Sequence, residues 1–177
     1  AKSIVLERPP LDVSSVITSG PQELSKERQT DDEPFHVSFI GTFADDEPVD
    51  LVIDAAKQLP EVSFSILGEP GHAPRKLLDS APSNVTFTGY LSGEDYWNHL
   101  ARIDAVISLT TYQYSLLGSA QEGMAMGKPL VLSSQPVLTE YFSSGVVFIE
   151  HSVASVVEGI AVSYTHLTLP TSVIVEV

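Results

Sequence analysis

One carboxylate lies among small residues, directly behind a polar loop, and this pattern most directly suggests chemistry. The segment 114–134 reads YSLLGSAQEGMAMGKPLVLSS, in which Ser115 to Gly118 form the polar opening and Glu122 is the acid. Free N–H groups at a helix start attract anions, and Gly118 and the small Ser119 let a ligand approach closely. Glu122, about one turn deeper, can accept hydrogen bonds from paired ribose hydroxyls. The pattern therefore indicates a site for a diphosphate joined to a ribose.

A purely structural interpretation uses the same residues. Serine is a common helix N-cap, so Ser115 can simply begin the helix, and Glu122 can be a solvated carboxylate on its surface. Spacing alone slightly favours this second interpretation. The sequence at this point leaves both open.

The elements that must position these residues alternate between strand and helix. Strand-like runs cover 35–43, 62–68, 84–90, 104–110, 129–134 and 146–150, and helical patterns cover 49–59, 75–81, 93–103, 116–126, 136–142 and 152–162. This alternation predicts an α/β fold, a doubly wound Rossmann-like parallel sheet of about six strands with helices on both faces. Right-handed crossovers favour the strand order 3-2-1-4-5-6. Ligands then bind at the carboxyl ends of the strands, between strands 1 and 4, where the helix over 116–126 begins.

The chain divides into three parts by pattern. Residues 1–34 are predicted to be an interdomain linker or arm, and residues 35–162 the nucleotide-sugar-binding Rossmann-like domain. The last part, 163–177, reads SYTHLTLPTSVIVEV and resembles translated sequencing-adapter sequence, so we expect a non-native or disordered tail. An ordinary C-terminal β-tail is the alternative. Because the chain begins with Ala1, we expect a fragment of a longer protein.

Composition excludes several classes of function. The chain has 9 basic and 23 acidic residues, a formal net charge of −14, which argues against binding nucleic acid. It contains no cysteine, which excludes thiolate chemistry and favours a reducing, cytoplasmic compartment. No run of about 20 apolar residues predicts a membrane span. No P-loop, GxSxG or Ser–His–Asp set is present. We expect neither a metal nor a cofactor.

Other candidate residues have simpler interpretations. The acidic run Asp45 to Glu47 predicts a solvated loop rather than a metal site. His72 and His99 are expected at the surface or the core edge, and Tyr96 is expected to pack with Trp97 against the sheet. GEPG at 68–71 is only half of a dinucleotide fingerprint.

Residues from about 35 to 160 resemble the C-terminal, donor-binding domain of family 4 GT-B glycosyltransferases (glycosyl transferases group 1). The most specific segment is AQEGMAMGKPLVLSS at 120–134, which is similar to the family's Glu-Ala-Met-Ala-x-Gly-x-Pro signature. The resemblance places Glu122 at the glutamate that holds the donor ribose. Earlier segments match in order: FIGTF, VDLVIDAAKQLP, VSFSILGEPG and NVTFTGYLSGEDYWNHLARIDAVISLT.

The resemblance implies a binding site for a UDP- or GDP-sugar. The loop of Gly41 and Thr42 would face the phosphates, and the backbone of Tyr90 and Leu91 would hold the base. The start of the helix over 116–126 would contact the donor through its first residues, Leu117, Gly118 and Ser119.

Three positions depart from the family's pattern. Tyr114 stands where the family has the first of two glutamates, and Thr42 and Glu47 stand where it has the basic pair that clamps the diphosphate. Loss of both cations implies weaker diphosphate binding. A subset of the family carries a Thr-Thr pattern instead, which implies donor contacts from Thr110 and Thr111.

By resemblance, the chain is the donor-binding half of a retaining glycosyltransferase that transfers a hexose to a glycan or lipid-linked acceptor in polysaccharide biosynthesis. Its implied partner is the missing N-terminal GT-B domain, through which the whole protein would make any peripheral membrane contact. We expect the fragment to be inactive alone, and we name no catalytic residue. A degenerate, non-catalytic interaction domain and half of a UDP-sugar epimerase remain as alternatives.

Overall fold

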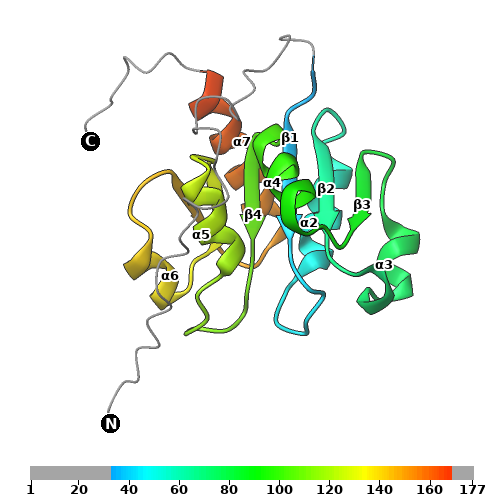
Figure 1. Ribbon diagram of the computed structural model, residues 1–177, viewed down its shortest axis with the longest axis horizontal. Coiled ribbons are helices and arrows are strands. Elements are labelled where there is room, and N and C mark those ends of the chain that lie inside the picture. The colour runs from blue at the N-terminus through cyan, green and yellow to red at the C-terminus, as the bar shows by residue number, and fades with distance from the viewer. Residues whose placement is uncertain (1–32, 169–177) are drawn as a thin grey trace.

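The chain folds into a parallel six-stranded sheet with helices on both faces (Figure 1), in a computed structural model that describes residues 33–168. The strands are β1 (His36–Ile40), β2 (Ser63–Leu67), β3 (Val85–Gly89), β4 (Ala105–Ser108), β5 (Leu130–Ser133) and β6 (Val146–Ile149). The helices are α2 (Val49–Gln58), η2 (Pro70–His72), α3 (Arg75–Ser80), α4 (Gly93–Arg102), α5 (Gly118–Ala125), α6 (Pro136–Tyr141) and α7 (Val153–Thr168).

The strand order is β3-β2-β1-β4-β5-β6, which confirms the predicted doubly wound topology. Every neighbouring pair is parallel, and Val37 of β1 is paired with Phe64 on one side and Ala105 on the other. The order therefore reverses between β1 and β4. The loops that follow these two strands lie together at the lower edge of the sheet in Figure 1.

Two apolar layers hold the helices on the sheet. Successive residues of a strand face opposite sides, so Val131 of β5 belongs to the core under α2 and α7, whereas Leu130 and Leu132 belong to the core under α4, α5 and α6. The four residues of β4 and the four of β5 are all buried, as expected for strands covered on both faces. Helix α5 is thereby fixed on one face and α7 on the other.

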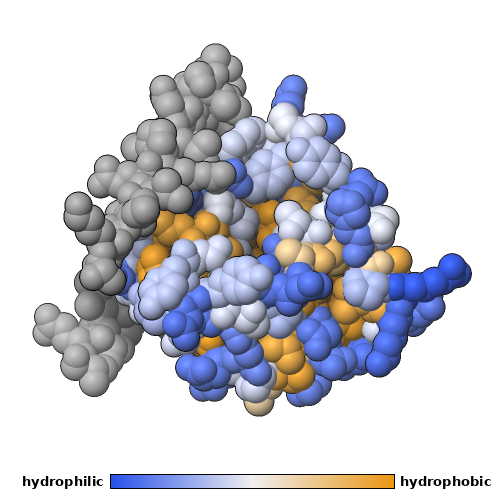
Figure 2. Space-filling model, turned by 90° about the horizontal axis from the view of Figure 1, so that it is seen from below, coloured by the Kyte–Doolittle hydropathy of each residue, from blue (hydrophilic) through white to orange (hydrophobic). Residues whose placement is uncertain are grey.

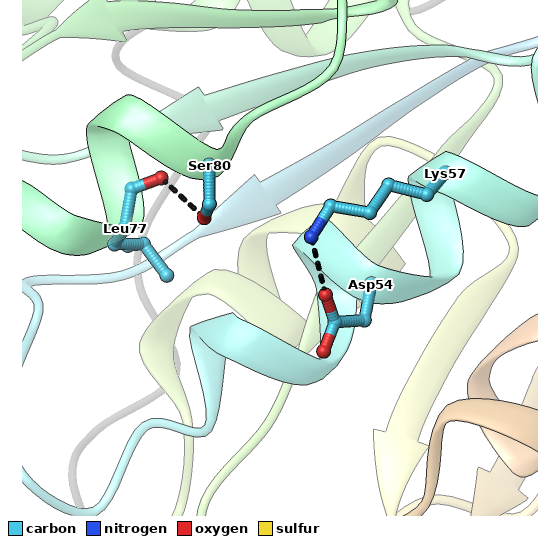
Figure 3. A network of polar contacts seen from close by, with 4 residues as sticks. All are labelled: Asp54, Lys57, Leu77 and Ser80. Carbon is cyan, nitrogen blue, oxygen red and sulfur yellow. Dashed lines mark hydrogen bonds and ion pairs between the residues drawn. The ribbon is translucent and has the colours of Figure 1, made fainter.

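Short polar contacts lie within α2 and within α3 (Figure 3). Lys57 Nζ donates to Asp54 Oδ1 at 2.7 Å within α2, and Ser80 Oγ donates to the carbonyl of Leu77 at 3.0 Å at the end of α3. Both contacts are local to one helix. They stabilise these helices and do not reach the carboxyl edge of the sheet.

A partly buried lysine joins the ends of α4 and α5. Lys128 lies just after α5, and its Nζ donates to the carbonyls of Ala101 at 3.0 Å and Ile103 at 2.7 Å, at the end of α4. Burial lowers the pKa of Lys128, while the nearby Asp104 opposes this shift. The ammonium thus satisfies carbonyls that the last turn of α4 leaves without helical partners.

The last helix is longer than the sequence predicted. The pattern placed its end at 162, but α7 continues to Thr168 and takes in the first residues of the predicted tail. Ser163 is buried, and its Oγ donates to the carbonyl of Gly159 at 2.9 Å. Such a hydroxyl bond to the preceding turn lets serine stay within a helix. Whether 163–177 is native stays a prediction, and 1–32 and 169–177 lie outside the described residues.

None of the helices described is both long and apolar enough to cross a membrane.

Two histidines form a polar cluster between α4 and the strands β1 and β2. His99 Nε2 lies 3.0 Å from Ser38 Oγ, and His36 Nε2 lies 3.0 Å from Ser65 Oγ. Burial lowers the pKa of His99 from 6.5 to about 4, helped by the charges of His36 and Arg102. His99 thus lies at the core edge, one of the two positions predicted for it.

Acidification is expected to destabilise the fold through His99. Below pH 6.5 the unfolded chain binds a proton that the folded protein accepts only near pH 4, so stability is lost as the pH falls through this window. The ring is partly exposed, so we expect a loss of only about 1–2 kcal/mol. Urea unfolding between pH 7 and 4.5 measures it. His99→Gln should flatten the dependence, whereas the same change at the exposed His72 should not; equal slopes in all three proteins would contradict the assignment.

Candidate functional site

A pocket of about 310 Å³ opens at the carboxyl edge of the sheet, beside the reversal between β1 and β4. It is the edge onto which Figure 2 looks, where patches of apolar surface appear between polar side chains. The lining residues come from the last residues of β1, β2 and β4, from the loops after β1, β2 and β3, from α4, and from α5 with the segment before it. They are Ile40, Gly41, Thr42, Glu47, Leu67, Gly68, Tyr90, Leu91, Tyr96, Ser108, Leu116, Leu117, Gly118, Ser119 and Glu122.

The first turn of α5 forms one wall of the pocket. The helix begins at Gly118, its N-cap is the extended Leu117, and no side chain caps it among the described residues. Ser115, considered as an N-cap in the alternative interpretation, therefore does not begin this helix. Ser119 Oγ lies 2.7 Å from Ser108 Oγ, which ties the start of the helix to the end of β4. The backbone N–H groups of this turn are the donors that the pocket offers to an anion.

Glu122 faces the same pocket from one turn deeper in α5. The hydroxyl of Tyr96, on α4, donates a short hydrogen bond to Glu122 Oε2. Burial raises the pKa of Tyr96, and the hydrogen bond and charge of Glu122 raise it further, so the phenol stays protonated. The contact holds one carboxylate oxygen and leaves the other to accept from a ligand hydroxyl. Glu122 is therefore partly exposed, and its carboxylate is bonded to another helix rather than standing free on the surface.

Helix α5 lies very close to the sheet behind the pocket. A Cβ at Gly123 would stand 2.9 Å from Leu130 Cδ2 and 3.0 Å from Val106 Cγ2. Only glycine permits this approach without displacing side chains of β4 and β5. The small residue therefore sets the depth at which its neighbour Glu122 lies.

The loop after β1 closes the other side of the pocket. The N–H groups of Thr42 and Ala44 donate to Glu47 Oε2 at 2.7 and 3.3 Å. Asp46 Oδ2 accepts from the buried hydroxyl of Thr110 at 2.5 Å. The sequence predicted that the acidic run Asp45 to Glu47 is a solvated loop. In the structure, Asp46 and Glu47 are instead hydrogen-bonded to the protein.

The structure brings together the predicted donor residues except Thr110 and Thr111. The others all line the pocket, whereas Thr111 lies in a separate open cavity with Tyr114 and Ser115. The role inferred for Thr110 is also not available, because Thr110 is fully buried and bonded to Asp46. Whether the lining residues bind a donor stays a prediction.

Sequence reasoning missed the contributions of Tyr96, Glu47 and Ser108. Tyr96 does pack with Trp97 against the sheet, as predicted, but its hydroxyl also reaches Glu122. The available signal was that a buried tyrosine hydroxyl needs a polar partner. Neither lysine, arginine nor histidine is among the described lining residues, so the pocket contains two carboxylates and no cationic side chain.

Residues 34–165 match the family model described as glycosyl transferases group 1. No curated protein sequence matches the chain.

Solved structures share the fold at low identity. HepE of Anabaena, solved with UDP and glucose, is 20% identical over 85% of this chain and 44% of its own, with a TM-score of 0.65. A Rickettsia africae glycosyltransferase is 14% identical over 89% of this chain and 45% of its own, with a TM-score of 0.71. Sucrose-phosphate synthase of Thermosynechococcus elongatus is 17% identical over 76% of this chain and 37% of its own, with a TM-score of 0.63.

The chain thus spans less than half the length of these structures. The family model covers most of the 177 residues and includes every strand and helix that lines the pocket. The chain belongs to the glycosyl transferases group 1 family and has the fold of one Rossmann-like domain of a GT-B glycosyltransferase.

Proposed function

We propose that this chain is the donor-binding half of a retaining glycosyltransferase that uses a UDP- or GDP-hexose. The observation that carries the proposal is the juxtaposition of Glu122 with the uncapped start of α5 in one pocket at the strand reversal. Family membership and the UDP bound to HepE in its structure support a nucleotide sugar as the ligand.

Each part of such a donor meets a suitable group. The N–H groups at Gly118 and Ser119 face the diphosphate, and the free oxygen of Glu122 accepts from the ribose hydroxyls. The backbone at Tyr90 and Leu91 borders the space for the base. As the glycosidic bond breaks, negative charge grows on the departing diphosphate, and fixed N–H donors stabilise that charge.

The remaining functions belong to the whole protein. The acceptor, a glycan or a lipid-linked saccharide, would bind an N-terminal domain that lies across the pocket. This chain would then bind donor and transfer nothing alone. The absence of cysteine supports a reducing compartment, which favours the cytoplasm.

Calorimetric titration with UDP and GDP tests the proposal. Because no cationic side chain lines the pocket, we expect weak binding of one nucleotide, with a Kd of about 0.1–1 mM. Titration with the corresponding nucleoside tests the base and ribose sites without the diphosphate. If UDP, GDP, uridine and guanosine all give neither heat nor NMR shifts at millimolar concentration, donor binding is refuted.

A second candidate is a degenerate domain that has lost donor binding. Three substitutions favour it. Thr42 and Glu47 stand where the family's site has basic residues, Tyr114 stands where it has a glutamate, and none of the three can make the contact of the residue it replaces. The epimerase alternative finds less support, because no histidine lines the described pocket. The nucleoside titration separates the two main candidates, since a degenerate pocket binds neither nucleoside nor nucleotide.

A further inference from the structure

The loop between β1 and α2 folds so that the side chain of Glu47 contacts the backbone of the same loop. Phe43 takes a left-handed backbone conformation with φ of 60°, which is uncommon for a bulky residue. The N–H of Glu47 donates to the carbonyl of Ala44 at 2.9 Å. The N–H of Thr111 donates to the carbonyl of Asp46 at 2.8 Å, which joins this loop to the loop after β4. These two backbone hydrogen bonds hold Glu47 in place, one within the loop and one to the loop after β4.

The carboxylate of Glu47 fills the place of an anion in this loop. Oε2 accepts from the N–H groups of Thr42 at 2.7 Å and Ala44 at 3.3 Å, and Oε1 accepts from the Thr42 hydroxyl at 3.3 Å. A Cβ at Gly41 would stand 2.6 Å from Oε2, so glycine is what admits the carboxylate there. Three donors that could bind a phosphate oxygen are thus already used by the protein.

The same carboxylate changes the electrostatics of the pocket. Glu47 and Glu122 both line it, and no described lining residue carries a compensating positive charge. At contact distance, like charges repel by several times the thermal energy even with the screening typical of protein surfaces. A ligand anion that approaches the β1 loop must therefore displace Glu47 or remain near the start of α5.

We propose that Glu47 is a specificity-determining residue, an internal competitor of the ligand's diphosphate at the β1 loop. The proposal rests on the proposed nucleotide site and deepens it. Glu47 lowers the affinity for nucleoside diphosphates and leaves the affinity for the nucleoside part unchanged. The diphosphate consequently adds little to binding in this chain.

Paired titrations of the 177-residue chain test this role. We expect uridine and UDP, or guanosine and GDP, to bind the unmodified chain with Kd values within about threefold of each other. Glu47→Gln removes the charge and keeps the shape, and Glu47→Ala also vacates the N–H groups. Both should tighten nucleoside diphosphate binding about tenfold, Ala more than Gln, and change nucleoside binding by less than about twofold.

Glu69→Gln is the matched control. Glu69 also accepts a backbone N–H of its own loop, from Gly71 at 3.4 Å, but it does not line the pocket. It should leave both affinities unchanged, which separates a local effect from a change in net charge. Urea unfolding verifies that each variant is folded.

Two results would overturn the inference, and they are distinguishable. If the nucleoside binds but the Glu47 variants bind its diphosphate no more tightly, only the role of Glu47 is refuted. If neither nucleoside nor diphosphate binds any of the proteins, the proposed donor site fails and the inference fails with it.

Discussion

Gly123→Val is expected to destabilise the fold by roughly 1–3 kcal/mol and to weaken nucleotide binding by tenfold or more. The added Cβ would already stand 2.9 Å from Leu130 Cδ2, and the two methyl groups of valine extend further toward β4 and β5. Helix α5 must then move away from the sheet, and it carries Gly118, Ser119 and Glu122 with it. Urea unfolding measures the first effect, and NMR titration with UDP and GDP measures the second.

Gly159→Val separates the two effects. Gly159 of α7 makes an equally close approach on the other face of the sheet, where a Cβ would stand 2.8 Å from Ile149 Cγ2 and 3.0 Å from Val131 Cγ1. This variant should lose similar stability and keep its nucleotide affinity under conditions in which it is folded. Equal affinity in the two valine variants would contradict the assignment of the site to α5.

Glu122→Ala is expected to weaken binding of the nucleotide, and of the nucleoside alone, by about 1–3 kcal/mol. The loss should appear for the nucleoside because, in the proposed site, the carboxylate would accept hydrogen bonds from the ribose and not from the phosphates. This sets Glu122 apart from Glu47, whose effect is expected only with the diphosphate. Ligand-observed NMR with nucleoside and diphosphate measures both, and an unchanged Kd would remove Glu122 from the site.

Tyr96→Phe is the companion variant for Glu122. It deletes the hydroxyl that orients the carboxylate and keeps the ring in the core under α4 and α5. A smaller loss of affinity than in Glu122→Ala is expected, because the acid remains but is no longer held in place. A larger loss than in Glu122→Ala would place the tyrosine hydroxyl itself on the ligand.

The sequence was sufficient to predict the architecture. Strand and helix alternate in short units, and a right-handed parallel crossover leaves little choice of topology, so the strand order follows from local pattern. It was also sufficient to place most candidate residues at one edge, because the ends of parallel strands coincide there. Membership in the family, inferred from the segment around Glu122, is likewise confirmed.

What the sequence could not supply are contacts between segments distant along the chain. Tyr96 and Glu122 are 26 residues apart, and Asp46 and Thr110 are 64 apart, so each pairing depends on how whole elements pack. Ser115 failed as an N-cap because the helix starts only at Gly118, after an extended Leu117. Thr111 was placed beside Thr110 in the site, but neither of them lines the pocket.

The two contacts between α4 and α5 have a mechanical consequence. Tyr96 joins Glu122 beside the pocket, and Lys128 joins the far end of α5 to the carbonyls of Ala101 and Ile103. These hydrogen bonds at the two ends of α5 oppose a rotation of one helix relative to the other. Helices α4 and α5 are therefore expected to move together, with Glu122 keeping its orientation relative to both.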